Sequence, residues 1–145
     1  MERITEGNQI RRWNDHIPLQ WKYTAGVAGE RFLQLLRQGK IQASVCRSCN
    51  KTYLPPKIFC KECFAQLSEW RDVSSDSGYV YSFTAVNGEI IALVKFDGVD
   101  GGVLGKLRKG REGPRIGIKV RAVFRRKEDR KGALSDIEYF ERTGV

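Results

Sequence analysis

Residues 46–63 read Cys-Arg-Ser-Cys-Asn-Lys-Thr-Tyr-Leu-Pro-Pro-Lys-Ile-Phe-Cys-Lys-Glu-Cys, and they hold all four cysteines of the 145-residue chain. Two C-x-x-C pairs therefore stand ten residues apart. Each pair can form a knuckle that points two thiolates at one ion, and two facing knuckles complete the tetrahedral sulfur shell that Zn²⁺ accepts. Because a complete shell leaves no position for water or substrate, we expect a structural zinc. Its predicted ligands are Cys46, Cys49, Cys60 and Cys63.

Three other interpretations of the cysteines stay open. A rubredoxin-type iron site has the same ligands, so spacing alone does not separate zinc from iron. Two disulfides would require an oxidising compartment, but residues 1–7 lack the apolar core of a signal peptide, which favours a cytoplasmic protein with reduced thiols. A thioredoxin-like redox motif would use one pair rather than two.

The net charge of +9 is concentrated in one part of the chain. Residues 103–131 hold twelve Lys or Arg and three acids, a surplus of nine that equals the net charge of the whole chain. A local basic field predicts an anionic partner such as nucleic acid, a phosphate-bearing cofactor or an acidic protein surface. The alternative is a solvated basic face. No apolar run approaches the ~20 residues of a membrane span, so no membrane partner is expected.

Residues 1–40 are expected to form a helical segment. The apolar residues at positions 10, 13 and 17 stand at helical spacing, and Pro18 ends this stripe. A second helix is predicted between Thr24, which can cap its start, and Gly39, which suits a left-handed exit. These helices either cover another core or present their aromatic side chains to a partner protein.

Residues 41–71 contain the cysteines and are expected to form a zinc ribbon, whereas residues 72–145 show the period of two that marks β-strands. Asn87-Gly88 is a strong hairpin signal. Ile118, Val120, Ala122 and Phe124 are expected to face a barrel core. Strands are predicted at residues 79–86, 90–96, 103–107, 116–124 and 134–140. Five short strands with glycine-rich corners favour a closed OB-fold barrel, with an SH3-like barrel as the second choice.

The sequence shows no clear catalytic constellation. His16 is the only histidine, and a lone histidine beside an aspartate is most often a surface or capping residue. The glycines of residues 98–102 lack the lysine and the following helix of a phosphate-binding loop. The carboxylates of the barrel half, Asp136 among them, are placed in turns or on solvent faces. We therefore expect the chain not to be an enzyme.

In this order and spacing the motifs resemble one known family. The motifs are Cys46-x-x-Cys49, Pro55-Pro56-Lys57, Cys60-x-x-Cys63, Ser77 to Thr84, Gly105-x-Leu107 and Ile116-Gly117-x-x-Val120, within residues 21–124. The family consists of microbial proteins that join an N-terminal helical segment to a rubredoxin-like zinc ribbon and a C-terminal OB-fold, long labelled a domain of unknown function. Asn50 and Lys61 depart from its usual Gly and Pro, and both departures leave the metal ligands intact. The resemblance thus implies a mainly β fold with N-terminal helices.

The same resemblance implies an accessory, acyl-CoA-associated role. Family members are associated with thiolases and related acyl-CoA enzymes, and some resemble subunits that bridge acetoacetyl-CoA thiolase and hydroxymethylglutaryl-CoA synthase. The chain is therefore expected to act as a non-catalytic scaffold that helps to bind or channel CoA thioesters. No catalytic residue is transferred by the resemblance.

CoA carries phosphates, which a basic barrel face can attract. The predicted phosphate contacts belong to the one strongly basic stretch and are Lys106, Arg108, Lys109, Lys119, Arg121 and Arg125. Nucleic-acid binding is the competing hypothesis, because zinc ribbons and OB-folds both occur in nucleic-acid-binding proteins and the net charge is positive. Against it, Phe124 is the only aromatic residue between residues 103 and 131.

Overall fold

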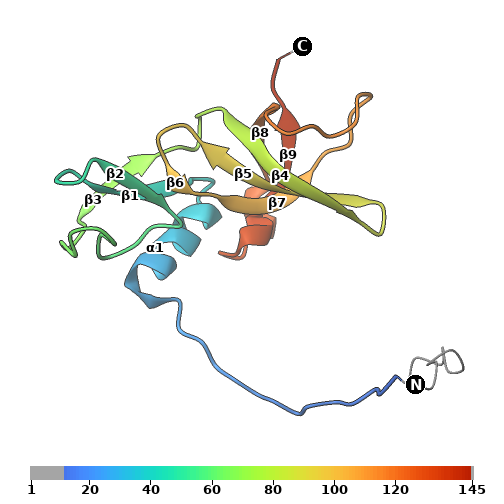
Figure 1. Cartoon of the computed structure of the whole chain (residues 1–145), viewed down its shortest axis with the longest axis horizontal. Helices are drawn as coiled ribbons and strands as arrows, with labels where there is room; N and C mark the ends of the chain where they lie inside the picture. Colours follow the sequence, from blue (N-terminus) through green and yellow to red (C-terminus); the bar gives the residue numbers. More distant parts are fainter. Residues whose placement is uncertain (1–11, 145) are drawn as a thin grey trace, which may run out of the picture.

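The computed structural model describes residues 12–144. An extended segment, residues 12–25, leads into helix α1 (Gly26–Arg37), which lies under two packed β units (Figure 1). No helix among the described residues is long and apolar enough to cross a membrane.

The first β unit is a four-stranded sheet that we call the ribbon sheet. Its strands are β1 (Gln42–Cys46), β2 (Lys51–Leu54), β3 (Glu69–Asp72) and β6 (Asp100–Gly101), in the order β3-β1-β2-β6. β6 comes from a loop of the second unit and pairs parallel to β2. Gly101 permits this pairing, because its φ is +91° and an added Cβ would collide with the Leu54 carbonyl.

The second β unit is a closed barrel. Its strands are β4 (Gly78–Val86), β5 (Glu89–Phe96), β7 (Val103–Leu107), β8 (Lys119–Phe124) and β9 (Ile137–Arg142), in the closed order β4-β5-β7-β9-β8. The loop between β8 and β9 carries two 3₁₀ turns, η1 (Lys127–Asp129) and η2 (Leu134–Asp136). The prediction of a mainly β chain is confirmed.

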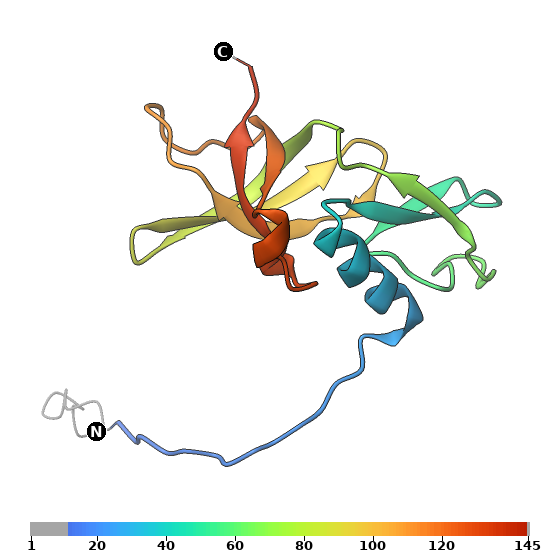
Figure 2. The same cartoon turned by 180° about the vertical axis from the view of Figure 1, so that it is seen from behind.

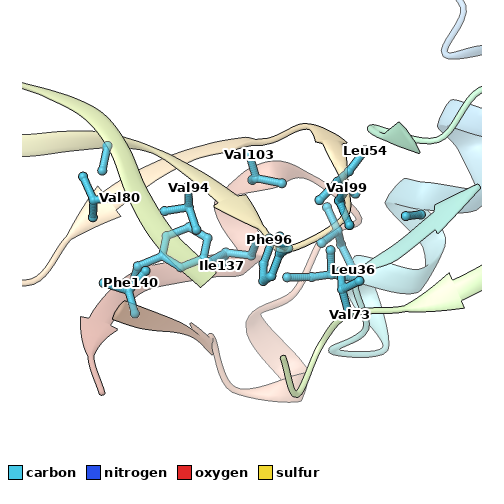
Figure 3. Close-up of a cluster of buried hydrophobic side chains, with 14 of the residues drawn as sticks. Leu36, Leu54, Val73, Val80, Val94, Phe96, Val99, Val103, Ile137 and Phe140 are labelled. Atoms are coloured by element: carbon cyan, nitrogen blue, oxygen red, sulfur yellow. The ribbon is translucent and has the colours of Figure 1, made fainter. Parts of the chain in front are cut away.

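A continuous hydrophobic core joins the helix, the ribbon sheet and the barrel (Figure 3). Leu36 of α1 and Leu54 of β2 pack in the same buried cluster as the barrel residues Val94 and Phe140. Val120 is fully buried in this cluster, while Ile118, Ala122 and Phe124 are partly buried against it, as the alternation of β8 predicts. The division into segments 1–40, 41–71 and 72–145 stays a prediction.

The prediction of more than one N-terminal helix is not confirmed. Helix α1 forms where it was predicted: the Thr24 hydroxyl accepts a hydrogen bond from the Gly26 N–H at 3.1 Å, and Gly39 exits with φ +76°. The stripe around Trp13 and Ile17 is not helical, because residues 12–25 are extended. A short helix has only marginal stability in water when it has no apolar surface to pack against. Ile10 lies outside the described residues.

Two strand ends also differ from prediction. β8 begins at Lys119 rather than at 116, because Gly117 adopts φ +89° and donates to the Val80 carbonyl, which leaves Ile116 72% exposed. β9 begins at Ile137, because residues 134–136 form η2. The Asn87-Gly88 hairpin is confirmed, with both residues at positive φ.

Candidate functional site

The ribbon sheet places the four cysteines on two turns. The first turn links β1 to β2 and begins at Cys46, the last residue of β1. Asn50 takes the left-handed conformation there, with φ 51°, so this residue replaces the usual glycine without breaking the knuckle. The second turn begins at Cys60, whose carbonyl accepts the N–H of Phe64 at 2.9 Å, and Phe64 is left-handed as well.

The four sulfur atoms converge on one point. They lie within 4.8 Å of one another, and the Cys46 and Cys63 Sγ atoms are 3.7 Å apart. Sulfurs at the corners of a tetrahedron around zinc, each about 2.3 Å from the ion, would be about 3.8 Å apart. The geometry of Cys46, Cys49, Cys60 and Cys63 therefore fits a structural Zn²⁺.

Tyr53 supports the site from β2, and sequence spacing gave no signal for this role. Its hydroxyl is 3.2 Å from the Cys60 Sγ, and both side chains are buried. This hydrogen bond lowers the pKa of the Cys60 thiol to about 6. An outer partner of this kind orients a metal ligand and favours its thiolate form.

The crowding of the sulfurs works against further ionisation. The hydrogen bond with Cys63, followed by burial, raises the pKa of the Cys49 thiol to about 12. The cluster therefore favours one thiolate at Cys60 and opposes another at Cys49 until a cation neutralises the charge. Thiolate ligands bind metal with release of protons, so zinc affinity should fall as the pH falls.

An ion pair ties the metal site to the barrel. The Lys61 Nζ in the second knuckle lies 2.6 Å from the Asp100 carboxylate on β6. The Asp100 side chain raises the pKa of Lys61, and Lys61 lowers the pKa of Asp100. The ribbon and the barrel are thus joined by a parallel strand pair and by this ion pair.

The predicted phosphate contacts divide into two groups. Four of them line one hollow of about 410 Å³ on the barrel, beside the β4–β5 turn and the β8–β9 loop: Lys106, Arg108, Lys109 and Arg125. Lys119 and Arg121 lie on β8 and do not line it. Sequence reasoning placed the six on a shared basic face but had no means to separate these groups.

Acidic neighbours neutralise part of this basic face. Lys106 pairs with Glu89 at 2.9 Å, and Glu141 accepts from both Arg108 and Arg121. Lys109 forms no ion pair within residues 12–144. Arg125 forms no ion pair there either, but its Nε donates to the Ser135 carbonyl at 2.6 Å. Of the four basic residues in the hollow, Lys109 is therefore the one most open to an anionic ligand.

A second, smaller hollow of about 250 Å³ adjoins the first, and the two share Ile90, Leu107, Arg108 and Lys109. Its lining adds the apolar side chains of Pro114 and Ile118. We call the two hollows together the barrel groove. It combines an apolar slot with five basic side chains and three carboxylates, those of Glu89, Glu112 and Glu138. The surplus of positive charge beside the slot suits an amphipathic anionic ligand.

Two other expected residues lie away from these sites. His16 is exposed in the extended segment, where its backbone N–H donates to Asp15. Asp136 lies in the η2 turn, in keeping with the expectation of a turn or a solvent face, but its side chain is buried, and its carboxylate accepts the backbone N–H groups of residues 131–133. It therefore fixes the β8–β9 loop.

The comparisons with known proteins agree with this geometry. The family described as "ChsH2, rubredoxin-like zinc ribbon domain" matches residues 33–68, the span that contains all four cysteines. A crystal structure of a protein of unknown function from the DUF35 family of Sulfolobus solfataricus is 30% identical, with a TM-score of 0.60, over 68% of this chain and 78% of that one. No curated protein gave a significant match.

A second solved structure carries the description "Ltp2-ChsH2(DUF35) aldolase". It is 16% identical, with a TM-score of 0.58, over 79% of this chain and 93% of that one, and at this identity the likeness shows the fold. The prediction that the chain is not an enzyme is wrong, because this neighbour is named an aldolase, which points to catalytic activity in the family. The prediction was based on the absence of catalytic motifs from this one chain. An active site can, however, be formed by residues from several chains of a complex.

Proposed function

Because the chain belongs to the DUF35 family, we propose that it is a component of an acyl-CoA enzyme complex, in which its barrel groove binds the CoA part of a thioester. The observation that carries this proposal is the groove itself, where Lys109 and its neighbours adjoin an apolar slot. The predicted partners are thiolase or hydroxymethylglutaryl-CoA synthase type enzymes.

The position of the groove supports a binding role. We assign the barrel to the OB-fold, which binds ligands on the face of its second and third strands and with the loops after its first and fourth strands. In this chain those strands are β5 and β7, and those loops are the β4–β5 turn and the β8–β9 loop. Residues from all four segments line the larger hollow.

The ligand chemistry follows from the lining. Phosphates of CoA would meet Lys109 and Arg125, and the less polar pantetheine arm would lie against Ile90 and Ile118. Charge-assisted hydrogen bonds to phosphate are the strong contacts in such a site. Arg108 would need to leave Glu141 or share it, because the two are 3.4 Å apart.

We expect Lys109→Glu to weaken CoA binding about tenfold or more, because a contact with phosphate becomes a repulsion. Isothermal titration of CoA into the zinc-loaded full chain measures this. Arg111→Glu is the matched control, since Arg111 lies in the same loop but does not line the groove, and it should change affinity less than about twofold. Equal weakening by both variants would mean that net charge, and not the groove, attracts CoA.

The extended segment, residues 12–25, supports a partner protein. We call it the N-terminal arm. Figure 1 shows it leading away from the β units. Its large apolar side chains are between 62% and 83% exposed: Trp13, Ile17, Leu19, Trp21 and Tyr23. Exposed apolar residues gathered in this way mark interaction sites, and we propose that the arm docks on the partner enzyme.

Replacing Trp13 and Trp21 together with Ser should weaken the complex with a thiolase-type enzyme encoded beside this gene about tenfold or more, because buried Trp residues dominate interface energies. Melting of the free chain should not change, since both side chains are exposed. The control is Arg12→Ser with Lys22→Ser in the same arm. An interferometry measurement in which the Trp variant binds as wild type does would refute this role of the arm.

Nucleic-acid binding is the second candidate, and one observation favours it. On β4, Tyr81 is 52% and Phe83 is 38% exposed, and the Lys95 Nζ lies 4.3 Å from the centre of the Tyr81 ring. Exposed aromatic side chains beside a cation can stack on bases. These residues do not line the barrel groove, so the two candidate functions use different surfaces.

A further inference from the structure

A third hollow, of about 770 Å³, lies between the end of α1 and the β8–β9 loop. We call it the helix–loop hollow. Figure 2 shows the helical turns before β9 beside the end of α1, and η2 contacts that helix. The lining consists of four basic side chains and two amides: Arg37, Lys40, Lys127, Arg130, Gln34 and Gln38. It shares no residue with the barrel groove.

The positive charge of this hollow is not neutralised. Within residues 12–144, none of its four basic side chains forms an ion pair, whereas Lys106 and Arg108 in the groove both do. Asp136 contributes charge nearby, but both of its carboxylate oxygens accept backbone N–H groups of the loop. Four basic side chains without an ion pair thus line one hollow that sequence reasoning did not find, while Arg126 and Lys131 of the β8–β9 loop form no ion pair within the described part of the chain but do not line it.

The arginine of the loop is held in place. Its Nε donates to the Arg125 carbonyl at 2.7 Å, and its guanidinium lies 5.5 Å from the centre of the Phe124 ring. Arg130 therefore keeps its charge half-buried at the hollow and loses little freedom when a ligand binds. Gly39 leaves the room for it, because an added Cβ would come within 3.0 Å of the Arg130 Nη1.

The helix dipole explains only part of this cluster. The negative end of α1 attracts cations, which accounts for Arg37 in the last turn. Lys127 and Arg130 come from a loop 90 residues further along the chain, and they bring their charges to the same hollow. Four like charges around one hollow repel one another, so an anion bound there would relieve the repulsion.

We propose that the helix–loop hollow binds a phosphate-bearing anion, with a diphosphate group as its ligand class. A diphosphate offers several acceptor oxygens and at least two negative charges. The guanidinium of Arg130 can hold such oxygens with paired hydrogen bonds, while Lys40 and Lys127 act as point charges. The hollow is thus a second anion site, separate from the proposed CoA groove, and the proposal does not depend on CoA binding.

Titration of inorganic pyrophosphate into the zinc-loaded full chain tests this site. At about 0.15 M salt, exposed charges beyond about 8 Å are screened, so a diffuse basic surface gives little binding. We expect Lys40→Gln with Lys127→Gln to weaken pyrophosphate binding about tenfold or more, because two direct charge contacts are lost. Both side chains are exposed, so the fold should be retained.

The matched control is Arg126→Gln with Lys131→Gln. It removes the same amount of charge, from the loop that carries Lys127, at residues that do not line the hollow. It should change affinity less than about twofold. The tenfold loss in the variant with Lys40→Gln and Lys127→Gln should persist in a Lys109→Glu background, where the phosphate contact of the proposed CoA groove is already removed, so that failure of the CoA proposal and failure of this one are told apart. Equal losses in the two double variants, or no saturable binding to the wild type, would overturn the proposal.

Discussion

Cys60→Ser should remove zinc from the protein and unfold the ribbon. The reason is the small core of this unit. Its own buried cluster contains Cys46, Tyr53, Cys60 and Leu67, with Cys49 packed against it, so two of its four buried side chains are themselves metal ligands. Binding free energies of structural zinc are of order 10 kcal/mol, which is comparable to the stability of a whole domain. Cys60 is fully buried, and its replacement removes the sulfur that the Tyr53 hydroxyl contacts.

Two measurements follow the loss of zinc. Elemental analysis should fall from about one zinc per chain to almost none, and limited proteolysis should cut within residues 41–71. Ser48→Ala is the control, because Ser48 is exposed between the ligands Cys46 and Cys49 and its replacement should keep the metal. A Cys60→Ser protein with a protease-resistant ribbon would show that the ribbon does not depend on zinc.

Val120→Asp should unfold the barrel. Val120 is fully buried on β8, opposite Gly78 of β4. An aspartate there would bury a carboxylate among apolar side chains, which we expect to cost about 4 kcal/mol or more. Because the core is continuous from the barrel to Leu36 and Leu54, the loss should also loosen α1 and the ribbon sheet.

Leu104→Asp is the matched control, since Leu104 also lies in a barrel strand but is 59% exposed. It should melt within a few degrees of wild type, whereas Val120→Asp should show no cooperative transition in thermal unfolding followed by circular dichroism. Similar melting of the two variants would mean that the faces of β8 are assigned the wrong way round.

Local patterns made the ribbon and the barrel predictable. The knuckles depend on residues three apart, and a hairpin such as Asn87-Gly88 depends on two adjacent residues that tolerate positive φ. The alternation in β8 placed Val120 in the core because strand faces follow from a period of two. Where one residue interrupts the period, as Gly117 does, the predicted strand began too early.

Features that depend on how separate segments meet in space were not predictable. Tyr53 supports Cys60 across a turn, and β6 joins the ribbon sheet from a loop of the barrel. Some of the basic residues are paired with acids in the structure, as Arg108 and Arg121 are with Glu141. Nothing in the sequence indicated these pairs. The failure of the first predicted helix has the same origin, because Trp13 finds no apolar surface within residues 12–144 to pack on.

The most direct test of the proposed function is a side-by-side titration of CoA and a mixed-sequence single-stranded oligonucleotide. It uses the zinc-loaded full chain at about 0.15 M salt, with and without a thiolase-type partner. We expect saturable CoA binding that strengthens with the partner, weakens as salt rises and is about tenfold or more weaker in Lys109→Glu. Tight oligonucleotide binding with no response to CoA under either condition would contradict the acyl-CoA proposal and favour the nucleic-acid function.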